Sequence, residues 1–148
     1  MNLAPERRWD DYWAGKKSTS SDLASHQRMA SVASQMLGDT ETAHAVLDLG
    51  AGDGHLTGHI AECMPTPHPA IMVASDLSAS ALSEHWRGPE GVYRVVCDAS
   101  RLPFKSESMT VVLSFGYASV ASYFDPSIQA EINRVLAPDG RLISDFRN

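Results

Sequence analysis

The feature that most constrains the fold is a glycine-rich turn that follows a short apolar segment. Residues 46–54 read VLDLGAGDG, with glycines at positions 50, 52 and 54. Glycine lets the backbone turn sharply and come close to a ligand, because it has no side chain to collide with it. A helix that starts at about His55 would direct its free N–H groups toward the same place. We therefore expect a strand–turn–helix unit that binds a ligand, rather than a turn that serves packing alone.

From residue 44 onward, short apolar runs alternate with helix-like segments. The predicted strands are Ala45–Leu49, Ala70–Ser75, Val92–Cys97, Thr110–Phe115 and Arg141–Phe146. The predicted helices are Glu6–Ala14, Asp22–Leu37, His55–Met64, Ser78–Trp86 and Pro126–Leu136. Continuously apolar strands that alternate with helices indicate a parallel sheet covered on both faces. We predict an α/β fold, a three-layer doubly wound sandwich whose mainly parallel sheet has the strand order 3-2-1-4-5.

Composition indicates one globular domain. The chain has 148 residues, of which 43% are hydrophobic and 20% charged, so it can bury a core. Its formal net charge of -6 argues against binding to nucleic acid or anionic lipid. Cys63 and Cys97 are too few for a disulfide framework or a four-thiolate zinc site. Because no apolar stretch reaches the length of a signal peptide or membrane span, we expect a cytoplasmic protein with no membrane partner.

Two aspartates follow predicted strands. Asp76 closes the second strand, 22 residues after Gly54, where an acid can accept hydrogen bonds from both hydroxyls of a ribose. Asp76 would also suit the start of the helix Ser78–Trp86, as a cap. Asp98 follows the third strand and can accept a hydrogen bond from an exocyclic amine such as that of adenine. Together these acids favour a ligand that contains adenosine.

Four segments, in this order, resemble the class I (Rossmann-like) S-adenosylmethionine-dependent methyltransferases: VLDLGAGDG, SDLS, CDASRLPF and AEINRVLAPDGRLISDF. Within that class the chain is most similar to the small-molecule group that includes the ubiquinone and menaquinone C-methyltransferases. The resemblance covers about residues 46–146. It implies S-adenosyl-L-methionine as cofactor, S-adenosyl-L-homocysteine as product, and methyl transfer to a small-molecule acceptor. Residues 1–43 would form a helical lid, and residues 44–148 the cofactor-binding part of a single domain.

The resemblance also implies which residues contact the cofactor, taken from the end of each strand in turn. The implied contacts are Asp48, Gly50, Ala51 and Gly52 for the amino-acid end, Asp76 and Leu77 for the ribose and its surroundings, Asp98 and Ala99 for the adenine, and Ser114 and Phe115 near the methionine moiety. Weaker candidates lie on the N-terminal lid: Tyr12, Trp13 and His26.

No catalytic residue is predicted. Methyl transfer is an in-line displacement at an activated carbon, so positioning and a dry site suffice. If the acceptor must lose a proton, His26 or Tyr117 would be the base. His55, His59 and Cys63 have a helical spacing that suits metal ligands, but they border an apolar stripe, and we predict no metal site.

Two features depart from the family pattern. The fourth strand begins with Met109 and Thr110, where the family usually has an aspartate, but that position is structural. The antiparallel hairpin that ends the family's seven-stranded sheet is missing after Phe146. We expect either a truncated chain or a natural short form, whose fifth-strand edge is covered by a homo-oligomer or a partner.

Two other functions stay open at this level. A nicotinamide-dependent oxidoreductase would also use Asp76 for ribose, but the glycines read G-x-G-x-G rather than G-x-G-x-x-G, and CDASRLPF has no use there. A truncated module that binds the cofactor, or only a partner, without methyl transfer would account for the missing hairpin.

Overall fold

The computed structural model describes residues 5–16, 20–38, 45–64 and 71–145. Its five strands form one sheet of order β3-β2-β1-β4-β5, in which every pair is parallel. The strands are β1 (Ala45–Leu49), β2 (Ile71–Asp76), β3 (Tyr93–Val96), β4 (Met109–Ser114) and β5 (Leu136–Ser144). The helices are α1 (Pro5–Gly15), α2 (Ser20–Gly38), α3 (His55–Cys63), α4 (Ala79–Leu82), α5 (Tyr117–Phe124) and α6 (Pro126–Val135). The predicted α/β fold and strand order are confirmed.

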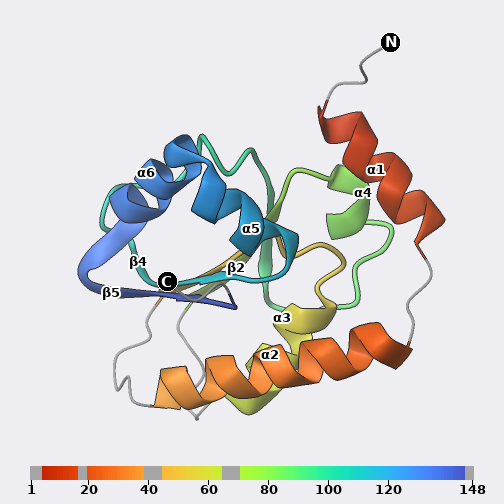
Figure 1. Ribbon diagram of the computed structural model, residues 1–148, viewed down its shortest axis with the longest axis horizontal. Helices are drawn as coiled ribbons and strands as arrows, with labels where there is room; N and C mark the ends of the chain where they lie inside the picture. The colour runs from red at the N-terminus through yellow and green to blue at the C-terminus, as the bar shows by residue number, and fades with distance from the viewer. Residues whose placement is uncertain (1–4, 17–19, 39–44, 65–70, 146–148) are drawn as a thin grey trace.

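Helices cover both faces of the sheet (Figure 1), with α2 and α3 on one side and α5 and α6 on the other. Successive side chains of a strand point to opposite faces. In β1, Val46 therefore packs in the core that contains Ile60 of α3, whereas Leu47 packs in the core that contains Ile132 of α6. These two apolar layers explain why the strands read as continuous apolar runs.

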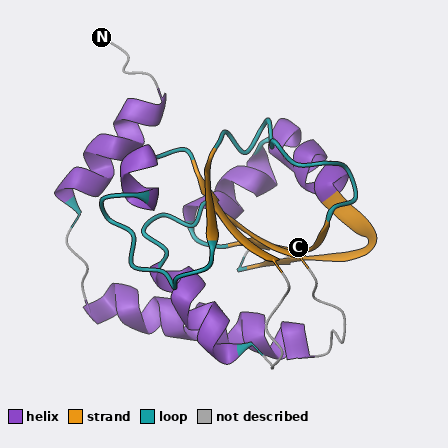
Figure 2. Cartoon of the chain, turned by 180° about the vertical axis from the view of Figure 1, so that it is seen from behind, coloured by secondary structure: helices purple, strands orange, loops and turns teal. Residues whose placement is uncertain are grey.

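The carboxyl ends of the strands meet at one edge of the sheet (Figure 2). Leu49 at the end of β1 is in register with Ser75 of β2 and with Ser114 of β4. Asp76 at the end of β2 is in register with Val96 of β3. The loops that follow these four strands therefore leave the sheet side by side, which is where open α/β sheets bind their ligands.

Two helices differ from the prediction. The helix expected over Ser78–Trp86 is only α4 (Ala79–Leu82), with Ser78 as its cap. Trp86, which was expected to end this helix, lies beyond it, and its indole packs against Gly54 and Gly88. Helix α5 (Tyr117–Phe124) was not predicted, because its sequence, YASVASYF, has no clear helical periodicity.

Strand β5 begins five residues earlier than predicted because it contains a bulge. Leu136 pairs with Met109 and Arg141 with Val111, so residues 137–140 are looped out between these pairs. A Cβ atom at Gly140 would lie 3.0 Å from the carbonyl oxygen of Met109, so this approach requires glycine. The sequence Pro-Asp-Gly is typical of a turn, which is why sequence patterns place the strand after it.

No helix within the described ranges is both long and apolar enough to cross a membrane. The prolines at positions 65, 67 and 69, which end the helix at the sequence level, lie outside the described residues.

Candidate cofactor-binding site

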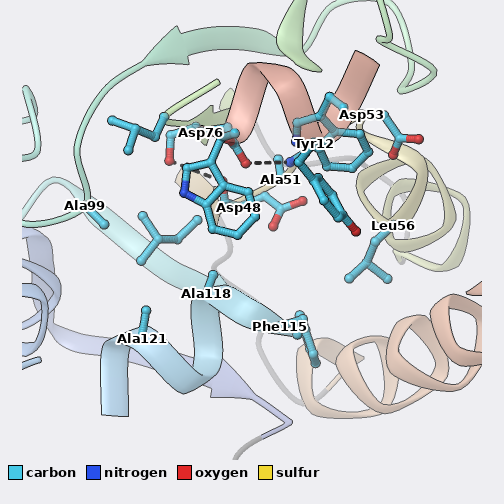
Figure 3. A pocket seen from close by; sticks show the side chains of 18 of the residues that line it. Tyr12, Asp48, Ala51, Asp53, Leu56, Asp76, Ala99, Phe115, Ala118 and Ala121 are labelled. Carbon is cyan, nitrogen blue, oxygen red and sulfur yellow. Dashed lines mark hydrogen bonds between the residues drawn. The ribbon is translucent and has the colours of Figure 1, made fainter. Parts of the chain in front are cut away.

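A cavity of about 340 Å³ opens at the carboxyl edge of the sheet (Figure 3), a volume in the range of small-molecule sites. Nine of the ten residues predicted to contact the cofactor line it: Asp48, Gly50, Ala51, Gly52, Asp76, Leu77, Asp98, Ala99 and Phe115. The tenth, Ser114, is fully buried within β4 and does not line the cavity. Residues from four separate strand ends are thus brought to one place.

Most backbone N–H groups of the glycine turn have acceptors within the protein. Their acceptors are the carbonyl oxygen of Ser75 for Gly50 (2.8 Å) and Ala51 (2.9 Å), Asp76 Oδ2 for Gly52 (2.9 Å), the carbonyl oxygen of Ala51 for Gly54 (3.0 Å), and Asp53 Oδ1 for His55 (3.2 Å). A dinucleotide pyrophosphate is bound by amides that are free at such a turn. The bonded amides of this turn disfavour the nicotinamide alternative.

Gly52 is the point of the turn that α1 approaches closely. Its φ is +58°, and a Cβ atom there would lie 2.4 Å from Cζ2 of Trp13. Both the left-handed backbone and the close approach require glycine. The indole of Trp13 therefore covers the turn on the side that faces α1.

Asp76 joins the glycine turn to the start of α4. Its Oδ2 accepts the N–H of Gly52 at 2.9 Å, and its Oδ1 accepts the N–H of Ser78 at 2.8 Å. Burial raises the pKa of Asp76, although the backbone hydrogen bonds oppose that rise. A carboxylate can accept about four hydrogen bonds. Asp76 therefore keeps the capacity to bind a ribose while it joins the glycine turn to Ser78, the residue that caps α4.

Asp48 is a carboxylate in the floor of the cavity and is 2% exposed. The hydroxyl of Thr57 donates to its Oδ2 at 2.6 Å. The pKa of Asp48 is raised to about 6, chiefly by burial. The hydrogen bond from Thr57 opposes this rise, and the negative charge of Asp76 adds to it. An ionised carboxylate in this position is stabilised by a cationic ligand group, because the positive charge offsets the cost of burial.

The loop after β3 contributes Cys97, Asp98 and Ala99 to the cavity. Asp98 is exposed, and its Oδ1 accepts hydrogen bonds from the N–H and the hydroxyl of Ser100, both at 2.8 Å. Cys97 was not predicted as a lining residue. Burial raises the pKa of its thiol to about 11, so it stays protonated and unreactive at neutral pH.

The opposite wall comes from α1 and α2. Its lining residues are Trp9, Tyr12, Trp13, Lys16, His26 and Met29. Asp10 fastens α1 to the start of α4: its Oδ1 accepts the hydroxyl of Ser78 at 2.5 Å and the N–H of Ser80 at 3.2 Å. Sequence reasoning missed Asp10 and Lys16, because no local pattern connects them to strands that follow much later in the chain.

The histidines lie at the junction of α2 and α3. The ring of His55 is 5.3 Å from that of His26 and 4.8 Å from that of His59, between ring centres. Within the described part of the chain, no group of three or more His, Cys, Asp or Glu residues is placed to hold a metal ion. The side chains of Cys63 and Tyr117 are outside what the structure describes.

Comparison with known proteins agrees with this geometry. A family profile described as "Methyltransferase domain" matches residues 47–144. Malonyl-[acyl-carrier protein] O-methyltransferase of Methylococcus capsulatus is 35% identical over 97 residues, which cover 66% of this chain and 35% of that protein. Ubiquinone/menaquinone biosynthesis C-methyltransferase UbiE of Desulfotalea psychrophila is 37% identical over 101 residues, covering 66% and 39%. A Micromonospora griseorubida protein named as a 23S rRNA (guanine-N(1)-)-methyltransferase is 32% identical over 99 residues, covering 66% and 30%.

Solved structures show the same fold. The YcgJ protein of Bacillus subtilis superposes with a TM-score of 0.64 at 24% identity, over 80% of this chain and 50% of that one. A chain from the complex of the Haloferax volcanii Trm112 methyltransferase activator with a methyltransferase gives 0.65 at 23% identity, over 92% and 58%. The chain thus spans about a third of the length of its curated relatives and about half of these structures.

The family profile runs from the glycine turn through the ends of β2, β3 and β4 to the last residue of β5, and so contains every strand-end residue of the cavity. The predicted family is therefore confirmed: the chain belongs to the methyltransferase domain family of class I S-adenosylmethionine-dependent methyltransferases.

Proposed function

We propose that this chain binds S-adenosylmethionine in the cavity and transfers its methyl group to a small-molecule acceptor. One observation carries the proposal. Three aspartates from the ends of three adjacent strands, Asp48, Asp76 and Asp98, line the same cavity around a glycine turn most of whose N–H groups are already bonded. Such a site selects a ligand that offers hydrogen-bond donors and positive charge, rather than one that offers phosphates.

Each aspartate suits a different part of the cofactor. Asp48, buried and beside the turn, would pair with the ammonium of the amino-acid end. Asp76 would accept the ribose hydroxyls, and Asp98 the adenine amine, with Leu77 and Ala99 beside the base. Charge-assisted hydrogen bonds of this kind are roughly twice as strong as neutral ones.

The proposed reaction needs alignment more than acid–base help. When bound, the cofactor supplies a methyl group already activated by a sulfonium. Phe115, which is 6% exposed, and the half-buried Leu56 and Met29 line the cavity with apolar surface that excludes water. An acceptor that must lose a proton would have the imidazole of His26 in the cavity wall as its base. Residues 1–43 would act as the lid and residues 44–148 as the cofactor-binding part.

The charge of the site favours a small molecule as acceptor. The relatives are named as methyltransferases of malonyl-[acyl-carrier protein], of ubiquinone/menaquinone biosynthesis and of 23S rRNA. Our chain carries a formal net charge of -6, and four aspartates line the cavity, so an RNA backbone would be repelled. The cytoplasmic location stays a prediction.

Isothermal titration calorimetry on the full chain tests the cofactor. S-Adenosylhomocysteine should bind with one site per chain, and NADH should not bind. The reverse result would overturn the proposal. Transfer of a radiolabelled methyl group to a panel of small molecules then separates an enzyme from a binding module. Tight binding without transfer to any acceptor would favour the module.

The exposed edge of the sheet supports a proposal about partners. Among the residues that the structure describes, β5 pairs only with β4, and its Leu142 is 44% exposed. An unpaired edge strand with apolar side chains invites another chain to cover it. We propose self-association at this edge, to be checked by light scattering after gel filtration. A monomer at all concentrations would contradict it.

A further inference from the structure

The walls of the cavity are unequal in charge. Among the described residues that line it, the charged side chains are four aspartates and one lysine: Asp48, Asp53, Asp76, Asp98 and Lys16. The four aspartates suit the donors of the proposed cofactor. Lys16 has no counterpart in that scheme, and it therefore points to an acidic ligand group.

Lys16 follows directly after α1 and is half-buried. Its Nζ lies 4.5 Å from the centre of the Trp13 ring and 5.5 Å from that of Tyr12. Within the part of the chain that the structure describes, Lys16 takes part in no salt bridge. Two aromatic faces thus hold an ammonium at the cavity by cation–π attraction, without neutralising its charge.

The backbone offers little competition for an acidic ligand group. A carboxylate that enters the cavity must find donors there, because an unsatisfied buried charge is costly. At the glycine turn, the N–H groups of residues 50, 51, 52, 54 and 55 already have acceptors in the protein. A carboxylate near this turn therefore gains from a side-chain cation.

Lys16 is close to the turn through Trp13. The indole of Trp13 packs on Gly52, and the ammonium lies on that same indole. Asp48, which would hold the ammonium of an amino acid, lines the same cavity. An anion and a cation on the two walls are complementary to a zwitterion.

We propose that Lys16 is a carboxylate-binding residue of this cavity, held in place by Trp13 and Tyr12. The inference rests on the proposed function. The carboxylate has two sources: the amino-acid end of the cofactor, or an acidic acceptor. Both offer the same chemistry to the ammonium, and binding experiments with matched ligands separate them.

The first experiment compares two nucleosides by calorimetry on the full chain. S-Adenosylhomocysteine carries the amino-acid end, whereas 5′-deoxy-5′-methylthioadenosine shares the adenosine thioether but lacks it. If Lys16 binds the cofactor, Lys16→Met should weaken the binding of S-adenosylhomocysteine by about 10- to 100-fold, which is the effect of losing one charge-assisted hydrogen bond. Its effect on methylthioadenosine should stay within about twofold, because that ligand has no carboxylate.

Two further variants control this result. Lys105→Met removes the same charge from an exposed site on the loop after β3 and should change neither affinity. Lys16→Arg keeps the charge and should retain most of the S-adenosylhomocysteine affinity. It also keeps the test decisive if Lys16→Met is poorly folded, as checked by its melting temperature.

The second experiment examines an acidic acceptor. With S-adenosylhomocysteine saturating, benzoate and benzamide are titrated as a pair of equal shape and different charge. If Lys16 binds the acceptor, wild type should prefer benzoate, and Lys16→Met should abolish that preference while its S-adenosylhomocysteine affinity stays unchanged.

The outcomes separate the two proposals. If wild type binds neither nucleoside, the proposed function fails. If wild type binds both nucleosides, and Lys16→Met alters neither the nucleoside ratio nor the benzoate preference, the function stands and the inference about Lys16 is wrong.

Discussion

The two walls of the cavity are built in different ways. The sheet wall places Asp48, Asp76 and Asp98 at the ends of parallel strands, where the strand register sets their spacing. The helical wall brings Trp13 from α1 and Lys16 from just after it, and α1 is fastened by the side chains of Asp10 and Trp13. Recognition of the cofactor can thus rest on the rigid part of the molecule, while closure of the site depends on contacts that a small change can break.

Gly52 is where the two walls meet. Its N–H donates to Asp76 of the sheet wall, and its Cα faces the indole of Trp13 of the helical wall. The following predictions separate the two walls; the first has the largest expected effect and the last the smallest.

Gly52→Ala should have the largest effect. The added Cβ would collide with Trp13, and alanine disfavours the φ of +58°. Backbone strain and overpacking together should lower the free energy of unfolding by about 3–5 kcal/mol, measured by urea denaturation. Gly91→Ala is the control, since Gly91 has a φ of +85° but nothing within 4 Å of its Cβ position. Equal losses in the two variants would show that the Trp13 contact contributes nothing.

Asp76→Ala tests the sheet wall. Loss of the ribose contacts should weaken the binding of S-adenosylhomocysteine by about 10- to 100-fold, as measured by calorimetry. Asp139→Ala, which removes an exposed carboxylate far along the chain, should leave the affinity unchanged. A lower melting temperature with unchanged affinity would mean that Asp76 serves only to join the glycine turn to the start of α4.

Asp48→Asn should give a pH-dependent gain in stability without ligand. The pKa of Asp48 is about 6 in the folded chain, above its value of about 3.9 when unfolded. The stability that this group contributes is therefore complete below about pH 4 and is lost as the pH rises to about 6. At pH 7 the variant should be more stable than wild type by about 3 kcal/mol, and it should lack the pH dependence between these limits.

Ligand binding, in contrast, should favour wild type over Asp48→Asn. S-Adenosylhomocysteine carries an ammonium that ionised Asp48 would bind, so its affinity for wild type should rise with pH through about 6, and its affinity for Asp48→Asn should not. Asp139→Asn serves as the control in both measurements. A wild-type affinity that is flat across this range would show that Asp48 does not touch the ligand.

Asp10→Ala tests the helical wall and should have the smallest effect. It removes the acceptor that fastens α1 to Ser78 and Ser80. We expect S-adenosylhomocysteine to bind about threefold more weakly, as for one lost hydrogen bond near the surface. The hydrogen bond from Ser78 lowers the pKa of Asp10, so this difference should disappear only well below neutral pH. Asp11→Ala, an exposed neighbour on the same helix, should bind like wild type.

Much of the sheet wall could be predicted because its signals are local. The bounds of β1 agree with the prediction, and the residues expected after β1, β2 and β3 all line the cavity. Ser114 was expected in the cavity but does not line it, because the alternation of side chains and the pairing with β1 bury it inside the sheet. The early start of β5 was missed because a bulge, held by a close backbone contact at Gly140, joins two pieces that read as helix end and turn.

The sequence by itself determined the strand order and the acids at the strand ends, because apolar runs, glycine turns and the residues that follow them are patterns of neighbours along the chain. Only the tertiary structure decided that Trp13 closes over Gly52, that Asp10 binds Ser78 from 68 positions away, and that Lys16 joins the cavity. Those contacts depend on how α1 packs against the folded sheet and α4, and no local pattern records that packing.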